Sequence, residues 1–126
     1  MSTIRTNTLL AADGSTTTEP SIPALDQRMA KAWVHFNGTG TVAINGAYNV
    51  SSITDSATGS YIMNFTNNLA DANFAVAGFS GRNSNPIVAG VADARSVSSL
   101  SVGTGNNNDA FAYVDVDSVA ITVFGN

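Results

Sequence analysis

The stretch AKAWVHFNGTGTVAINGAYNVSSITD, residues 30–55, decides how this chain folds. β-Branched and aromatic residues fill it, and two Asn-Gly pairs, at positions 37–38 and 45–46, interrupt them. Such residues are enriched in strands, and an Asn-Gly pair supplies the positive φ that a two-residue hairpin turn requires. The stretch therefore predicts short antiparallel strands joined by tight turns.

Short runs of the same kind, separated by turn residues, continue to the end of the chain. Strands at this spacing are typical of a β-sandwich or a small barrel. We predict an all-β fold, an antiparallel and jelly-roll-like β-sandwich. The expected strands cover 31–36, 41–45, 47–54, 60–66, 73–80, 86–92, 96–102, 110–116 and 118–124.

Within several strands, large apolar residues on one face alternate with small apolar residues on the other. A sheet with one solvated face should instead be polar on that face. The small residues therefore indicate a second packed surface, which is most simply another subunit. The faces expected to be buried hold Tyr61, Met63 and Phe65, then Phe74 and Val76, then Val119, Ile121 and Val123; the opposite faces include Ala75, Ala77, Phe79, Ala120 and Phe124.

Residues 1–21 are polar and predict an extended N-terminal arm, with a disordered tail as the alternative. Residues 22–32, IPALDQRMAKA, predict the one helix. Pro23 suits the first helical position and Asp26 the first turn. The apolar stripe of this helix is so narrow that it must lie on the domain or on sister helices. Residues 33–126 then form the β-sandwich head.

The composition excludes several classes of protein. The chain has 126 residues, a net charge of −4, 11% charged residues and no cysteine. A nucleic-acid-binding protein would need a basic stripe, and the four arginines are scattered. No apolar stretch approaches the ~20 residues that span a bilayer, and no signal peptide is visible. We therefore expect no nucleic-acid partner and no membrane partner. If the protein works outside a cell, we expect its release by a route such as cell lysis.

No residue pattern predicts an enzyme, a cofactor or a catalytic residue. His35 is the only histidine, and no G-x-S-x-G motif accompanies it. Asp115 and Asp117 lie two residues apart and could form a loose Ca²⁺ site, although the order of a dedicated calcium loop is missing. The alternative for both is a solubilising role, so no metal site is predicted. A polysaccharide hydrolase is disfavoured because no close carboxylate pair is evident.

Two amide-rich hairpin tips, GRNSN at 81–85 and GTGNNND at 103–109, are candidates for binding. Asn and Arg side chains present paired donors and acceptors that suit sugar hydroxyls, and loop tips often carry binding function. Plain polar loops are the alternative. The receptor-loop candidates are Arg82, Asn83, Asn85, Asn106, Asn107 and Asn108.

The region 30–78 resembles a recurring module of bacteriophage tail-fibre and related virion proteins. It follows the pattern A-K-A-W-V-x-F-N-G-T-G-T-V-A-I, then N-V-S-S-I-T-D, a Gly-bearing turn, Y-x-x-N-F-T and D-A-N-[FY]. The opening MSTIRTNTL…ADG is similar to the start of small phage fibre proteins. The chain departs from the module at 45–48, where an Arg-led turn is common, and no motif is recognised beyond residue 80.

The resemblance implies a homotrimeric β-sandwich head whose N-terminal segment attaches to the virion, and it implies no catalytic residue. Candidates for the core and the trimer contacts are Trp33, Phe36, Ile44, Phe65, Phe79 and Phe124. Candidates for virion attachment are Ile4, Arg5, Leu9 and Leu10. We expect a short trimeric tail fibre or adhesin head that binds a host surface glycan. The alternative is a decoration protein that stabilises the capsid or tail.

Overall fold

The computed structural model describes residues 2–3, 5–8, 10–14, 22–82, 85–106 and 112–125, and only the backbone of residues 24, 82, 85–93 and 106 among them. Within these described residues, nine strands follow one helical turn, α1 (Pro23–Asp26). The all-β prediction is confirmed, and each of the nine expected strands overlaps an observed one, although within the expected 110–116 only Ala112–Tyr113 is described as a strand. The strands are β1 (Ala30–Asn37), β2 (Ala43–Tyr48), β3 (Val50–Ala57), β4 (Ser60–Phe65), β5 (Ala75–Arg82), β6 (Asn85–Arg95), β7 (Ser99–Asn106), β8 (Ala112–Tyr113) and β9 (Ser118–Phe124).

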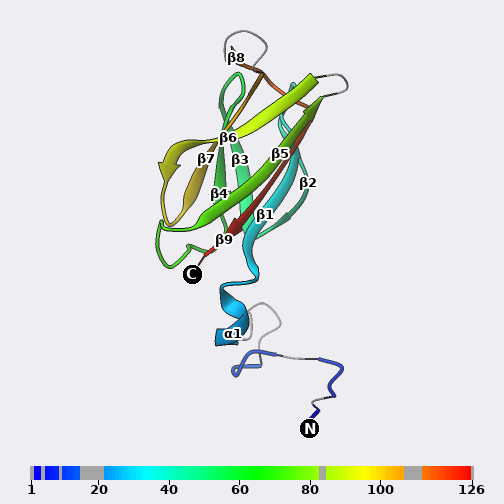
Figure 1. Ribbon diagram of the computed structural model, residues 1–126, viewed down its shortest axis with the longest axis vertical. Helices are drawn as coiled ribbons and strands as arrows, with labels where there is room; N and C mark the ends of the chain where they lie inside the picture. Colours follow the sequence, from blue (N-terminus) through cyan, green and yellow to red (C-terminus); the bar gives the residue numbers. More distant parts are fainter. Residues whose placement is uncertain are drawn as a thin grey trace.

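The strands pair in the order β2-β1-β9-β5-β6-β7-β4-β3, with β8 added to β7, and every pair is antiparallel. β5 and β6 pair only near their shared hairpin, from Ser80↔Ile87 to Arg82↔Asn85. The path folds over at this hairpin into two antiparallel sheets, one of β2, β1, β9 and β5 and the other of β6, β7, β4 and β3 (Figure 1).

The core lies between the two sheets, and the alternation along each strand selects its members. The faces expected to be buried in β4 and β9 are buried, which confirms the alternation of the sequence. Edge-to-face ring pairs join Phe36 to Tyr61, at 5.1 Å between centroids, and Phe65 to Phe74, at 5.9 Å. The largest fully buried side chains include Tyr61, Phe36, Met63, Leu100, Val34, Val102, Val116, Val119 and Val123.

The helix is shorter than predicted. It starts at Pro23, as expected, and ends at Asp26, and β1 already begins at Ala30 inside the range predicted to be helical. Ala30 pairs with Phe124 of β9, so strand pairing in the sheet overrides the helical spacing of the apolar residues. A single turn of helix is marginal in water, whereas a strand held by a neighbour gains both hydrogen bonds and burial.

The turn predicted at Asn45-Gly46 is wrong. Both residues lie inside β2, where His35 pairs with Gly46 and Phe36 pairs with Ile44. Asn45 is therefore the extra residue of a β-bulge. A bulge, like a hairpin turn, can accommodate an Asn-Gly pair. The chain turns instead at Asn49, the one described non-glycine residue with positive φ, at 53°.

Asn49 links the two sheets as well as turning the chain. Its Nδ2 donates to the carbonyl oxygens of Lys31, at 3.0 Å, and Asn67, at 3.1 Å. Its Oδ1 accepts the backbone N–H of Asn67 at 2.8 Å. Lys31 belongs to β1 of one sheet, and Asn67 follows β4 of the other. Asparagine is among the residues that adopt a left-handed conformation at low cost, which explains its place here.

Candidate functional site

An apolar sheet face turned away from the core is the strongest candidate for a functional surface. The strand register aligns Tyr48, Trp33, Thr122 and Ala77 across β2, β1, β9 and β5, and aligns His35, Ala120 and Phe79 in a parallel row. Their neighbours along the strands, such as Val34 and Ile121, are buried, so these residues point outward. We call this set, together with Ala75, the outer face.

The outer face exposes aromatic rings and lacks formal charge. Phe79 is 83% exposed, Trp33 41% and Tyr48 38%. Among the described residues that the register places between Trp33 and Phe79, none is Asp, Glu, Lys or Arg. The histidine of this face, His35, has its Nε2 3.1 Å from Ser118 Oγ. Large exposed apolar patches on folded proteins usually mark interaction sites.

The six candidates for core and trimer contacts divide into two groups. Phe36 and Phe65 are buried in the core, and Phe124 is partly buried. Trp33 and Phe79 belong to the outer face, and Ile44, on the edge strand β2, is also exposed. The prediction named these six residues as one set, and the strand register shows that the exposed aromatic residues Trp33 and Phe79 share one surface.

The two candidate receptor loops leave neighbouring strand ends. Arg82 pairs with Asn85 at the β5–β6 hairpin, and Asn106 pairs with Ile87, two residues further along β6. The backbone thus brings both loop bases to one end of the molecule, the end opposite the chain termini (Figure 1). Asn83, Asn107 and Asn108 lie outside the described residues, as do the side chains of Arg82, Asn85 and Asn106.

The candidates for virion attachment lie on the N-terminal segment. Arg5 and Leu10 are exposed. Ile4 and Leu9 lie outside the described residues.

A buried polar cluster at the loop end was not found by sequence reasoning. The Tyr61 hydroxyl lies 3.0 Å from the carbonyl oxygen of Gly38 and 2.9 Å from Asp115 Oδ1, and donates its proton to this pair of acceptors. The same Asp115 oxygen accepts the backbone N–H of Gly59 at 2.6 Å. Thr104, fully buried beside this cluster, donates from Oγ1 to the Val114 carbonyl at 2.7 Å. Asp115 is thus a structural acceptor that ties the segment before β9 to the β3–β4 hairpin and to Tyr61 of β4.

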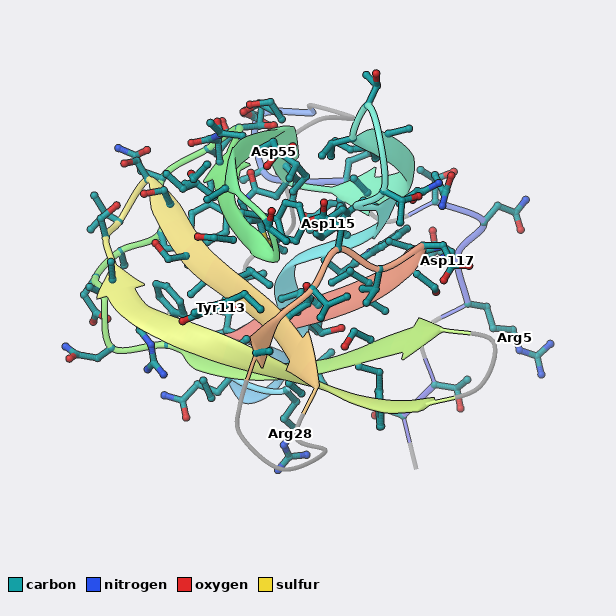
Figure 2. All side chains as sticks on the ribbon, turned by 90° about the horizontal axis from the view of Figure 1, so that it is seen from above. Arg5, Arg28, Asp55, Tyr113, Asp115 and Asp117 are labelled. Carbon is teal, nitrogen blue, oxygen red and sulfur yellow. The ribbon has the colours of Figure 1, made fainter. Side chains whose placement is uncertain are left out.

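The geometry gives little support to a Ca²⁺ site at Asp115 and Asp117. Figure 2 looks onto the loop end and labels Asp55, from β3, and Asp115 and Asp117, from the segment before β9. Asp115 is engaged by Gly59 and Tyr61, while Asp117 is exposed. Among the residues that the structure describes, no group of three or more His, Cys, Asp or Glu could hold a metal ion.

Tyr61 makes the stability of the fold sensitive to alkaline pH. Burial raises the pKa of its hydroxyl above the ordinary value, and the hydrogen bond and charge of Asp115 raise this pKa further. The unfolded chain therefore releases this proton at pH ~10 while the folded chain retains it. The contribution of Tyr61 to stability is constant below pH ~10 and is lost above it, by up to ~1.4 kcal/mol per pH unit.

Urea unfolding between pH ~9 and ~11 measures this slope. We expect Tyr61→Phe to remove the part due to Tyr61, because phenylalanine has no proton to release. The slope that remains in this variant belongs to the other groups that titrate in the range. A slope as steep in Tyr61→Phe as in the wild type would contradict the assignment.

A shallow hollow of about 280 Å³ adjoins the outer face where the chain enters the sandwich. Gln27, Asn73, Ala75, Phe124 and Gly125 line it. Ala75 pairs with Phe124 in the sheet, so the apolar wall of the hollow continues the outer face, and two side-chain amides form its rim.

No family model, no curated protein and no solved structure matches this chain. Within the part of the chain that the structure describes, no helix is long and apolar enough to cross a membrane.

Proposed function

We propose that this chain is a non-enzymatic structural protein of a bacteriophage virion that assembles as a homotrimer through its outer face. The observation that carries the proposal is this face itself, a charge-free surface on which Phe79 is 83% exposed. Burying apolar surface is worth about 25 cal/mol per Å², so exposed rings of this size favour association. The alanine and threonine side chains between the rings, Ala77, Ala120 and Thr122, are small and allow a second surface to approach closely. The resemblance of residues 30–78 to a phage fibre module supports the virion assignment.

In this proposal the sandwich is a jelly-roll-like head at the exterior of the tail or capsid. Residues 1–21 form the arm, and Ile4, Arg5, Leu9 and Leu10 attach it to other virion proteins. An arm with a small apolar patch suits this role, because it can add buried area to a neighbour without being folded beforehand.

The same proposal assigns host recognition to the loop end. The strand ends that carry the 83–84 and 107–111 connections are neighbours through β6, which would place both loops over one footprint. Amide-rich loops suit a surface glycan, because carboxamides match the donor and acceptor pattern of sugar hydroxyls. No cofactor takes part.

Self-association provides the most direct test. We expect the recombinant wild-type chain to sediment with the mass of three chains at micromolar concentration. We expect Phe79→Asp to raise the dissociation constant by roughly thirtyfold, ~2 kcal/mol, because a charge replaces the most exposed apolar side chain of the outer face. Val97→Asp is the matched control, since Val97 is exposed but lies in the turn between β6 and β7, off the outer face.

Sedimentation velocity at several concentrations gives both results, and circular dichroism verifies that each variant is folded. A well-folded wild type of single-chain mass at micromolar concentration would overturn the trimer. Equal effects of the two substitutions would show that the outer face is not the contact.

The location on the particle distinguishes the tail fibre from the decoration protein. Electron cryomicroscopy of intact particles should place the chain at the tail tip for a fibre and across the capsid or tail lattice for a decoration protein. For the fibre, glycan-array binding by the recombinant protein should fall on combined substitution of Arg82 and Asn106–Asn108. Particles that lack the chain and still adsorb to the host would support the decoration role.

A further inference from the structure

The two Asn-Gly pairs of this chain have the same local chemistry but different surroundings. In such a pair, the backbone nitrogen of glycine can attack Cγ of the preceding asparagine, because glycine has no side chain to hinder the approach. The Cγ–Nδ2 bond breaks, ammonia leaves and a five-membered succinimide forms. Water then opens the ring at either carbonyl and leaves aspartate or isoaspartate. The net reaction consumes one water and releases one ammonia.

At Asn37-Gly38 the fold holds both the attacking nitrogen and the side-chain carbonyl that it would attack. Asn37 Oδ1 accepts the backbone N–H of Thr39, at 2.8 Å, and the hydroxyl of Thr39, at 2.7 Å. The attacking nitrogen, that of Gly38, donates to the carbonyl oxygen of Val116 at 2.8 Å. Gly38 is buried, and Tyr61 and Val116 occupy the space that a Cβ at this position would need. Ring closure at this pair would have to break the Gly38–Val116 hydrogen bond and to rotate an Asn37 side chain that two hydrogen bonds hold in place.

Asn45-Gly46 lies in a different environment. Asn45 is exposed and is the unpaired residue of the β-bulge between β1 and β2. β2 is the end strand of the path and pairs only with β1. Edge strands and bulges open with a small free energy compared with the global unfolding of a protein. Side-chain and backbone rotation at this pair therefore meets less resistance than at Asn37-Gly38.

We propose that Asn45 is a site of spontaneous deamidation in the folded protein and that the fold protects Asn37. The reaction changes the formal net charge of the chain from −4 to −5 by the loss of one neutral amide. Where isoaspartate forms, it adds a methylene to the backbone of β2 inside the bulge. The outer face begins in this strand, at Tyr48, so the modification alters the edge of that face.

The test is a time course on the full-length folded protein in mildly alkaline buffer at physiological temperature, with the same protein in concentrated urea beside it. Peptide mapping by mass spectrometry, with enzymatic methylation of isoaspartate, follows positions 37 and 45 separately. In the folded protein we expect Asn45 to convert at least about tenfold faster than Asn37, a ratio set by their local opening. In urea the rates of deamidation at Asn37 and Asn45 should agree within about threefold, because the chain is then unfolded and both pairs have similar local surroundings.

Equal rates in the folded protein, or faster conversion of Asn37, would overturn the proposal. A rate difference as large in urea as in the folded state would also overturn it, because the protection would then not come from the fold. Both outcomes are independent of any role in a virion.

Gly46→Ala is the matched variant. Gly46 does not adopt positive φ, and an added Cβ would lie 3.4 and 3.5 Å from two Trp33 ring carbons, which is ordinary van der Waals contact. Thermal unfolding verifies that the variant is folded. We expect conversion at Asn45 to fall about tenfold, because the methyl group obstructs attack by the residue 46 nitrogen. Conversion at Asn37 should not change, and an unchanged rate at Asn45 would exclude the succinimide route.

Discussion

Replacing Gly59 by alanine is expected to destabilise the fold by more than ~3 kcal/mol, because it combines backbone strain with a clash that cannot relax. Gly59 closes the hairpin between β3 and β4 with φ of +64°. A Cβ there would collide with the carbonyl oxygen of Thr104, and would lie 2.6 Å from the Val114 nitrogen. These are backbone atoms of a buried segment, so no rotamer change makes room.

The clash would also disturb the buried polar cluster. The Gly59 N–H donates to Asp115 at 2.6 Å, and its carbonyl accepts the N–H of Thr104 at 2.8 Å. Moving the hairpin away from the Cβ would lengthen both bonds, and a buried polar group left without a partner costs about 1–3 kcal/mol.

Gly40→Ala is the matched control for Gly59→Ala. Gly40 has the same φ of +64°, but an added Cβ would meet nothing within 4 Å. Gly40→Ala should lower the free energy of unfolding by about 1 kcal/mol, because only conformational strain is added. Urea unfolding of both variants gives the two free energies. Equal losses would mean that the packing around Gly59 contributes nothing.

Phe36→Ala is expected to cost about 3–5 kcal/mol, because it removes a large ring from the centre of the core and leaves a cavity. Phe36 is fully buried and packs edge-to-face on Tyr61, at 5.1 Å and 73°. Its loss also removes one wall of the cluster that holds Asp115. The same chemical change at Phe79, which is 83% exposed, serves as the control.

The two phenylalanine variants separate the core from the outer face. At high dilution, Phe79→Ala should change the free energy of unfolding by less than ~0.5 kcal/mol, as exposed substitutions do. Its effect should grow with protein concentration if the outer face is a contact between chains, because association stabilises the folded form by mass action. The effect of Phe36→Ala should not depend on concentration. A small loss in Phe36→Ala would contradict its place in the core.

Local patterns predicted most of the strands but fewer of the contacts that organise the candidate sites. Alternation placed Phe65 inward and Phe79 outward correctly, because side chains on a strand alternate with a period of two wherever the strand pairs. The same patterns failed at Asn45-Gly46, where pairing with β1 absorbed the pair into a bulge, and at residues 30–32, where pairing with β9 replaced a helix. Both failures arise where pairing with a distant strand stabilises a conformation that the local residues alone do not favour.

By itself, the sequence determined the all-β class, the positions of the strands and the faces on which their apolar residues lie, since these follow from propensities and spacing within a few neighbouring residues. Tertiary structure decided which strands became neighbours. It brought Trp33, Tyr48 and Phe79 onto one surface and carried Asp115 into contact with Gly59 and Tyr61, more than fifty residues away along the chain. Register between distant strands depends on packing of the whole core, and this packing exists only once the two sheets have closed on each other.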